Sequence, residues 1–514
     1  MSKTIIIIGA GLAGLSAALQ AAENGCNVKL VSSLPSERAQ SVMAEGGINA
    51  ALNTKDENDS PEEHFTDTIK AACGLADPNA VWGMTQAAPE LVHWLLKLGV
   101  KFNMSGHDDV DLRNFGGQKK KRTAFAQSDT GKQIMTAMID AVRRKEASGM
   151  VERFSHHSFL TLRLCGNICC GCVIRDEYSQ ETVELPGDAV IVATGGMHGL
   201  FGNTTGSLSN TGEVTAELFR LGVPLANGEM IQYHPTTVKC GGKRMLISEA
   251  ARGEGGRLFA MKDGKQWYFM EEKYPELGNL MPRDITAREI WKVSHESEVF
   301  LDMTEISEEI ISNKLSGLAD DCMTYLHKDI RKEPVSVLPG IHYFMGGILV
   351  DEQHRTPIQN LCAAGECCAQ YHGANRLGGN SLLGALYGGR VAAKSACEQA
   401  DVVDLSCATQ IDFPPASQIS EIKQLNKVMQ ETMGVVRNEN TLLNGIQTVQ
   451  ALTGNLPLLG MAVLKSALAR KESRGAHWRE DYPKSNDDDY LKTTVARFDG
   501  KQIQISFVPV PERR

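Results

Sequence analysis

Three glycines near the N-terminus are spaced to bind the phosphates of a nucleotide. Gly9, Gly11 and Gly14 form the pattern Gly-x-Gly-x-x-Gly between an apolar run, Thr4–Ile8, and a segment with helical composition at 15–24. Gly9 permits a tight turn, Gly11 lets the backbone approach a pyrophosphate, and Gly14 lets helix and strand pack closely. Because a helix N-terminus attracts anions, the motif predicts a dinucleotide-binding loop.

The end of the following strand departs from the usual pattern. Residues 28–31 lead into Ser32 and Ser33, where such domains usually carry an acidic residue for the ribose hydroxyls. Ser32 offers a weaker hydrogen bond at the same place. The residues alone therefore leave the identity of the nucleotide open.

Composition and charge exclude several classes of protein. The net charge of −9 argues against nucleic acid or an anionic membrane surface as a partner. We interpret the basic cluster at 119–122 as a solvated loop. The longest apolar stretches, at 5–8 and 189–193, are too short to span a bilayer. Since the N-terminus also lacks the pattern of a signal peptide, we expect a cytoplasmic protein with no transmembrane segment of its own.

The cysteines do not form a recognisable metal site. The chain has 13 of them, and without an export signal they should be mostly reduced thiols. Four lie close together, but their spacing matches no zinc or iron–sulfur pattern: Cys165, Cys169, Cys170 and Cys172. They fall on two apolar runs around residues 166–167, which predicts a β-hairpin with packed cysteines and no bound metal.

The elements around the glycine motif predict an α/β fold with a discontinuous nucleotide-binding domain. A strand, a glycine loop, a helix and a second strand open the chain, which is a βαβ unit with a parallel pair. Helical periodicity, strands and glycine turns then suggest three units. A Rossmann-type domain at 1–226 and 346–404 surrounds an inserted domain at 227–345. A helical C-terminal domain with a polar, loop-like tail covers 405–514. We expect a last strand near 503–508.

Blocks along nearly the whole chain occur in the order of one family's motifs. They are AEGGINA at 44–50, DTG at 129–131, ATGG at 193–196, HPT at 234–236, EAARGEGG at 249–256, PRD at 282–284, HYFMGG at 342–347, AGE at 364–366, HGANR at 372–376, NSLL at 380–383 and SRGAH at 473–477. On these blocks the chain resembles the flavoprotein subunits of succinate dehydrogenase and fumarate reductase, a family that includes L-aspartate oxidase. The resemblance implies FAD, a capping domain at 227–345, and hydride exchange between flavin N5 and a dicarboxylate.

The resemblance also implies a role for individual residues. Arg283 would deliver a proton to the substrate, with Glu249 and Arg252 relaying its replacement. The residues expected to bind the substrate are His234, Ser248 (threonine in the family), His342, Arg376 and Phe115. The residues expected to contact FAD are Gly9, Gly11, Gly14, Ser32, Ser41, Gly46, Gly47, Glu366, Asn380, Ser381 and Leu382. An arginine acid is chemically tolerable because the developing carbanion is far more basic and the fixed charge stabilises it.

One departure from the family concerns attachment of the cofactor. Members that bind FAD covalently carry a histidine in an Arg-Ser-His-Thr block, and the matching residues here are Arg38, Ala39, Gln40 and Ser41. An amide cannot supply the imidazole nitrogen for that bond, so we expect non-covalent FAD. Within the family this favours fumarate reduction or oxidase-type chemistry over succinate oxidation.

A second departure separates two substrates. L-aspartate oxidase carries a glutamate suited to the substrate ammonium before the Gly-Gly of the substrate loop, and this chain has Phe115 there. Burying an unpaired ammonium beside an apolar ring would cost several kcal/mol, of order 2–7 or more. Together with the tail DDDYLK at 487–492, Phe115 favours fumarate and succinate, and L-aspartate oxidase is the alternative.

No haem-attachment motif or iron–sulfur cysteine set is recognisable in the sequence, so electrons must come from elsewhere. The resemblance implies an iron–sulfur subunit as partner, and a soluble electron carrier is the alternative. Such a partner could dock the chain at the inner face of the membrane.

Overall fold

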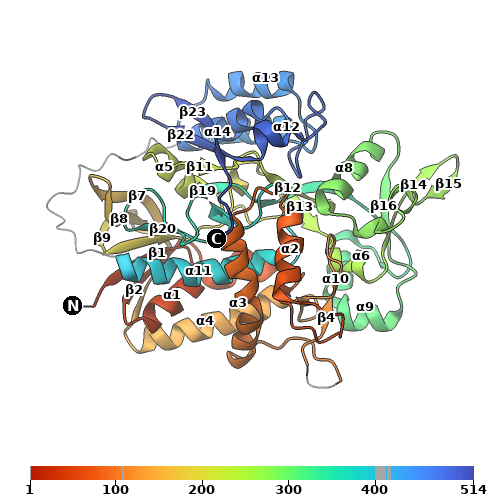
Figure 1. The fold of residues 1–514 in the computed structure, drawn as a ribbon, viewed down its shortest axis with the longest axis horizontal. Coiled ribbons are helices and arrows are strands. Elements are labelled where there is room, and N and C mark those ends of the chain that lie inside the picture. The colour runs from red at the N-terminus through yellow and green to blue at the C-terminus, as the bar shows by residue number, and fades with distance from the viewer. Residues whose placement is uncertain (1, 107–108, 400–412, 414–417) are drawn as a thin grey trace.

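A five-stranded parallel sheet forms the centre of the nucleotide-binding half of the computed structural model, which describes residues 2–106, 109–399, 413 and 418–514 (Figure 1). Its strand order is β20-β10-β1-β2-β6. The strands are β1 (Thr4–Ile8), β2 (Asn27–Ser32), β6 (Val151–Ser155), β10 (Ala189–Val192) and β20 (Leu361–Ala363). The predicted parallel pair of β1 and β2 is confirmed, with Ile5 opposite Val28.

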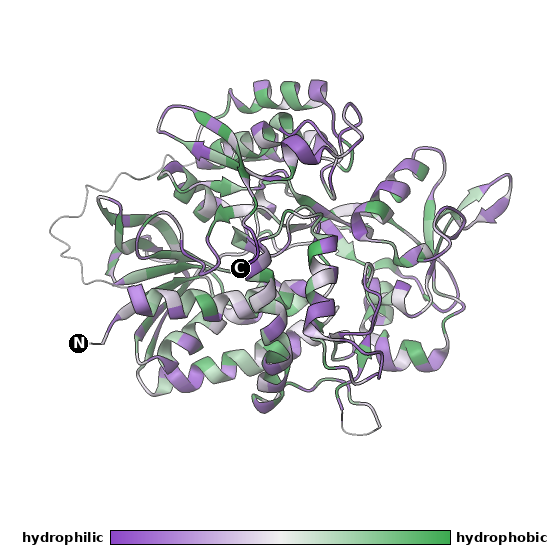
Figure 2. Cartoon of the chain, viewed as in Figure 1, coloured by the Kyte–Doolittle hydropathy of each residue, from purple (hydrophilic) through white to green (hydrophobic). Residues whose placement is uncertain are grey.

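Alternating side chains of this sheet pack against different layers. Ile5 and Ile7 of β1 face the helices α1 (Leu12–Glu23), α4 (Thr130–Ala147) and α11 (Asn380–Gln399). Ile6 and Ile8 instead pack on a three-stranded antiparallel sheet of β7 (His157–Cys165), β8 (Ile168–Asp176) and β9 (Thr182–Pro186). Both faces are therefore shielded from water, as is usual for parallel sheets, and the strands are largely green, that is hydrophobic, in Figure 2. Each buried isoleucine contributes about 1.5–3 kcal/mol.

The predicted hairpin of cysteines is confirmed by β7 and β8. Cys169 and Cys172 lie on β8 and are completely buried in the apolar layer behind the parallel sheet, where they act as small hydrophobic side chains. Within the described residues, no group of three or more His, Cys, Asp or Glu side chains could hold a metal ion.

The stretch predicted as an inserted domain, 227–345, contains two antiparallel sheets; the second of them, with α8 and α9, forms a lobe on the right of Figure 1. The order β13-β12-β18 makes the first sheet, and β15-β14-β16-β17 makes the second. The elements are β12 (Ile231–Cys240), β13 (Lys243–Leu246), α6 (Glu249–Gly253), β14 (Arg257–Lys262), β15 (Lys265–Trp267), α7 (Phe269–Lys273), α8 (Arg283–Val293), β16 (Val299–Asp302), α9 (Glu308–Lys314), α10 (Ser316–Asp321), β17 (Val335–Ser336) and β18 (Leu338–Phe344). A separate apolar core, including Ile247, Leu258 and Ile290, holds this lobe together.

The C-terminal part is not purely helical. The expected helices are present as α12 (Ile419–Thr432), α13 (Glu439–Val449) and α14 (Asn455–Ala469), but the polar tail also forms β22 (Lys492–Phe498) before β23 (Ile503–Pro509). β22 was expected to be a loop, and that expectation was wrong. It pairs with β11 (Leu225–Ala226), which pairs with β19 (Gly347–Leu349), so the tail completes a sheet begun far earlier in the chain.

A buried ion pair attaches this tail to β12. Glu229, two residues before β12, accepts a hydrogen bond from Arg470 Nε at 2.7 Å and another from Thr494 Oγ1 at 2.6 Å. All three residues are completely buried. Removing one partner from such a pair leaves an uncompensated buried charge, which costs about 3–5 kcal/mol.

Helical periodicity at 60–72 and 78–98 predicts two of the remaining helices, α2 and α3, and both are confirmed, whereas α5 was not predicted; the domain boundaries stay predictions. The helices are α2 (Pro61–Ala71), α3 (Pro78–Lys97) and α5 (Glu213–Arg220). The predicted boundary at 404 and 405 lies outside the described residues. Among the helices that the structure describes, none is both long and apolar enough to cross a membrane.

Candidate functional site

A cavity of about 1040 Å³ runs from the glycine loop after β1 to the stretch at 227–345. It is lined by most of the residues that the sequence singled out: Gly9, Gly11, Ser32, Ser41, Gly46, Gly47, Phe115, His234, Ser248, Glu249, Arg283, His342, Glu366, Arg376, Ser381 and Leu382. In the part of the chain that the structure describes, Gly14, Arg252 and Asn380 lie outside this lining. One continuous cavity therefore brings together both groups of predicted residues.

The glycine loop presents backbone to one end of the cavity. Gly9 has φ +111°, and a Cβ there would collide with the carbonyl oxygen of Ala193. A Cβ on Gly14 would collide with the carbonyl oxygen of Gly9, so this glycine lets α1 pack on β1. Gly11 is different, because its Cβ would meet only Ser41 Oγ at 3.6 Å and Ala39 at 3.8 Å. Gly11 therefore keeps the cavity open in front of the α1 N-terminus.

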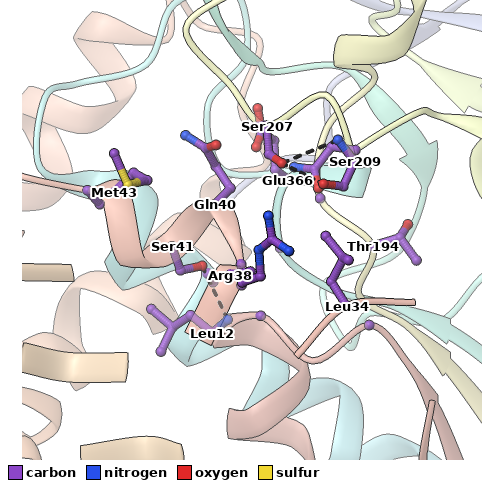
Figure 3. Close-up of a pocket in the computed structure, with 18 of the residues that line it drawn as sticks. Leu12, Leu34, Arg38, Gln40, Ser41, Met43, Thr194, Ser207, Ser209 and Glu366 are labelled. Atoms are coloured by element: carbon purple, nitrogen blue, oxygen red, sulfur yellow. Dashed lines mark hydrogen bonds between the residues drawn. The ribbon is translucent and has the colours of Figure 1, made fainter. Parts of the chain in front are cut away.

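The first turn of α1 is tied to the loop after β2. Ser41 Oγ accepts a hydrogen bond from the backbone N–H of Leu12 at 3.3 Å, with Arg38 and Gln40 close by in the same loop (Figure 3). Ser32, at the end of β2, lines the cavity and is buried, and its Oγ has no hydrogen-bond partner among the described residues. An unpaired buried hydroxyl is costly, so Ser32 is suited to a ribose hydroxyl. The open loop, the helix N-terminus and this hydroxyl fit a dinucleotide such as FAD.

Phe115 covers the next part of the wall. Its ring lies against Gly46, where a Cβ would stand 2.9 Å from Phe115 Cζ, and the ring is 2% exposed. The guanidinium of Arg113 lies 5.6 Å from the ring centroid. Beside Gly46, burial and then Asp321 raise the pKa of Glu45 to about 8. The carboxyl of Glu45 is therefore mostly neutral near pH 7, while the guanidinium of Arg113 keeps its charge.

Two histidines and an arginine converge at the other end. The rings of His234 and His342 lie 5.2 Å apart, centroid to centroid. Burial, followed by the charge of Arg283, holds the pKa of His234 well below its ordinary value, and burial and His234 do the same for His342. Both rings are therefore neutral. Burial and Arg283 lower the pKa of Arg376 to about 9, so its guanidinium keeps its charge at neutral pH.

Some donors at this end are free to bind a ligand. Within the described chain, His234 Nε2 and Arg376 Nε are buried and have no hydrogen-bond partner. The other nitrogens are fixed by the protein. His234 Nδ1 accepts from the backbone N–H of Thr236 at 3.3 Å, which places the single N–H of the neutral ring on Nε2, and His342 Nδ1 lies 2.8 Å from Thr205 Oγ1. Ser248 lines the same space, and its Oγ caps α6 by accepting from the N–H of Ala250 at 3.4 Å.

Arg283, Glu249 and Arg252 form a buried chain of charge-assisted hydrogen bonds. Arg283 donates to Glu249 Oε2 from Nε at 2.9 Å and from Nη2 at 2.6 Å. Arg252 Nη2 donates to the other oxygen, Oε1, at 3.1 Å. Burial alone would raise the pKa of Glu249, but the charges of Arg283 and Arg252 outweigh it and the pKa is lowered. Arg252 therefore does not line the cavity itself, and its hydrogen bond to Glu249 connects it to the residues that do.

The charges at this end do not balance. Arg252, Arg283 and Arg376 carry three positive charges and Glu249 carries one negative charge, which leaves two positive charges on residues that are at most 6% exposed. Burial raises the pKa of Glu366, another lining residue, to about 7, so its carboxyl is only about half ionised near neutrality. The balance stays positive, and buried charge of this kind requires a partner. A small dianion would supply it.

The side chain of Asn380 is held by other residues of the protein. It accepts from Asn49 Nδ2 at 2.7 Å, contacts His64 Nε2 at 2.9 Å and donates to Thr68 Oγ1 at 3.0 Å. It therefore fixes the start of α11, while the neighbouring Ser381 and Leu382 line the cavity. A contact of Asn380 with the cofactor stays a prediction.

Gln232 was missed. Its Oε1 accepts from Arg283 Nη1 at 3.0 Å, and its Nε2 donates to Asn375 Oδ1 at 3.0 Å and to the carbonyl oxygen of Arg376 at 2.8 Å. It thereby connects the two arginines that reach the cavity. The signal was present, because Gln232 stands two residues before His234 on β12, and strand side chains two apart share a face.

Comparisons with known proteins place this geometry in a family. Residues 4–382 match the model of an FAD binding domain, and residues 452–513 match the fumarate reductase flavoprotein C-terminal model. The chain is 38% identical over 576 residues to the succinate dehydrogenase flavoprotein subunit of Bacillus subtilis, covering 100% of this chain and 98% of that protein.

Two further relatives agree. The 8-methylmenaquinol:fumarate reductase flavoprotein subunit of Wolinella succinogenes is 32% identical, with 100% of this chain and 92% of that one covered. A solved structure of a variant of the E. coli quinol fumarate reductase subunit FrdA superposes with a TM-score of 0.90 at 27% identity, covering 99% of this chain and 97% of FrdA. This chain therefore belongs to the family of succinate dehydrogenase and fumarate reductase flavoprotein subunits, which are FAD-dependent oxidoreductases.

Proposed function

We propose that this chain interconverts fumarate and succinate, with a preference for fumarate reduction. The observation that supports the proposal most directly is the excess positive charge on buried residues at one end of the cavity. Fumarate and succinate are C4 dianions, so either one neutralises that excess. The relatives named above are succinate dehydrogenase and fumarate reductase subunits, which agrees with this substrate class.

The residues divide the work between binding and proton transfer. Arg376 offers a planar fork to one carboxylate, and the partnerless Nε2 of His234 and the hydroxyl of Ser248 donate to the other end, together with His342. FAD, when bound, accepts or supplies the hydride at flavin N5. Arg283 holds the proton that the alkene carbon needs, and Glu249 and Arg252 replace it through the hydrogen bonds of the buried chain.

Phe115 supports a dicarboxylate over an amino acid. The ring is buried beside the cavity, under the cation of Arg113, and it has no atom that could accept from an ammonium group. Aspartate would place its ammonium in a site that already has excess positive charge. Both effects oppose the L-aspartate oxidase alternative.

Gln40 supports a dissociable cofactor. It lines the cavity beside Ser41 and the α1 N-terminus, and its amide cannot form the bond that a histidine would make (Figure 3). We expect acid precipitation of the purified holoprotein to release the flavin into the supernatant. Flavin that stays with the precipitate would contradict this part of the proposal.

Electron delivery needs a partner of this chain. We propose an iron–sulfur subunit, because relatives are described as subunits of larger reductases and dehydrogenases. A soluble electron carrier is the alternative. Activity with reduced viologen alone, followed by restored activity with the physiological donor only when an iron–sulfur subunit is added, distinguishes the two.

The test of the substrate uses FAD-loaded protein under argon. Its flavin is reduced with dithionite, and fumarate is then added, while a second sample of oxidised protein is mixed with L-aspartate. We expect rapid reoxidation by fumarate and no bleaching by aspartate. Bleaching by aspartate would make the chain an aspartate oxidase, and no response to fumarate would overturn the proposal.

A further inference from the structure

The loop at 114–118 connects the FAD-binding half to the proton relay through its backbone. Gly116 N donates to Glu249 Oε1 at 3.2 Å, and Gly117 N donates to the carbonyl oxygen of Leu280 at 3.2 Å. Phe115, in the same loop, lines the cavity. The loop therefore contacts the substrate chamber, the relay carboxylate and the segment that precedes Arg283 at once.

The Gly116 N–H completes the coordination of the Glu249 carboxylate. An ionised carboxylate has about four sites for donors. Arg283 fills two of them, both on Oε2, and Arg252 Nη2 fills one on Oε1 at 3.1 Å. Gly116 supplies the fourth donor, also on Oε1. Without it, Oε1 would be held by Arg252 alone, and the carboxylate could rotate away from the line between the two arginines.

The space around Glu249 requires glycine at Gly116. A Cβ there would stand 2.5 Å from Glu249 Oε1 and 3.2 Å from the carbonyl oxygen of Met281. On the other side, a Cβ on Gly378 would stand 2.9 Å from Oε2. The carboxylate is thus enclosed between two glycines of the FAD-binding half, whereas its arginine partners belong to the stretch at 227–345.

We propose that Gly116 is a positioning residue of the proton relay, whose N–H aligns the Glu249 carboxylate between Arg252 and Arg283. This inference rests on the proposed function, because the relay matters only if a proton is delivered to the substrate.

The matched variants are Gly116→Ala and Gly106→Ala. Neither position needs a positive φ, and a Cβ on Gly106 would meet no heavy atom within 4 Å in the described chain. With the FAD-loaded protein, dithionite-reduced flavin is mixed with saturating fumarate in H2O and in D2O. We expect G116A to slow reoxidation about tenfold or more, up to the ~10²–10⁴ that a positioned acid–base group contributes, with a larger solvent isotope effect; steady-state assays should give a KM for fumarate that is little changed. G106A should behave as the parent.

A double-mutant cycle decides whether Gly116 acts through Glu249. In an Glu249→Gln background, G116A should slow the residual rate less than twofold, because the carboxylate it aligns is gone. An equal loss in both backgrounds, or a parent-like rate and isotope effect for G116A alone, would overturn the inference. If G116A does not retain FAD, Gly378→Ala crowds the other oxygen and must show the same signature. A parent enzyme that fumarate does not reoxidise refutes the proposed function instead.

Discussion

The two ends of the cavity differ in the groups that they present to a ligand, which are mainly backbone at one end and charged side chains at the other. At the nucleotide end, Gly9, Gly11 and the N-terminus of α1 present backbone and one spare hydroxyl, that of Ser32. At the substrate end, charged side chains from α6, α8 and the loop before α11 carry an excess of positive charge. Backbone groups bind the phosphates that any dinucleotide shares, whereas the buried charges select one class of substrate. Binding of cofactor and choice of substrate should therefore be separable by mutation.

The sharpest separation is expected from Arg283→Ala. Arg283 lies at the substrate end and contacts no part of the glycine loop, so FAD content should stay as in the parent while kcat falls by about 10²–10⁴. Flavin absorbance measures the FAD content, and fumarate-dependent viologen oxidation measures kcat. Loss of FAD together with activity would show that the two ends are not independent.

Replacement of His234 by alanine tests binding at the same end. A hydrogen bond to a charged group contributes about 1.5–3 kcal/mol, which corresponds to roughly a 10- to 150-fold increase in KM for fumarate. We expect kcat to change much less, because Arg283 and Glu249 remain in place. Steady-state kinetics give both constants, and a fall in kcat with constant KM would assign His234 to chemistry rather than to binding.

The nucleotide end can be divided further with two glycines. Gly14→Ala should destabilise the fold by about 1–3 kcal/mol, because the methyl group would collide with the backbone of Gly9. Gly11→Ala should leave the melting temperature of the apoprotein unchanged and weaken FAD binding, since its Cβ would make only ordinary van der Waals contacts, with Ser41 and Ala39, at the edge of the cavity. Thermal unfolding and FAD titration separate them, and equal effects of both variants would contradict this assignment.

The smallest effect is expected for the pH dependence of stability at Glu45, which lies in the cavity wall between the nucleotide end and the substrate end. Glu45 has a pKa near 8 in the folded chain and about 4.5 when unfolded, so the folded state holds an extra proton between these values. Its contribution to stability is thus complete below pH 4.5 and is lost as the pH rises through 8. In Glu45→Gln apoprotein, the fall of the melting temperature over that window should be smaller by about 2–4 °C. An unchanged slope would place the titration elsewhere.

Local patterns carried most of what the sequence could predict. The run Thr4–Ile8 before the glycine motif predicts β1, α1 and their parallel partner, because both faces of the strand and the loop geometry are encoded within 30 residues or so. β22 was missed because Lys492–Phe498 carries few large apolar residues, although its first partner, β23, follows it directly; its second partner, β11, precedes it by more than 250 positions.

The site shows the same division. The sequence motifs identified most of the residues that line the cavity, but the direction of each side chain depends on packing that a single sequence does not reveal. Asn380 begins α11 beside two lining residues, yet it turns inward to His64. Gln232 and Gly116 contact the relay from elements 116 positions apart, and only the fold brings Gln232 Oε1 and the Gly116 N–H to the same three charges.

The ion pair of Glu229 with Arg470 has a consequence for biosynthesis. Glu229 lies just before the strand that carries Gln232 and His234, and its last hydrogen-bond donor, Thr494, is 265 residues further along the chain. At about 5–20 residues per second, a ribosome needs roughly 13–53 s to reach that residue. Until then the nascent chain has a carboxylate that it cannot bury. The flavin-binding half can thus begin to form during translation, but the substrate chamber matures only when the tail has been made.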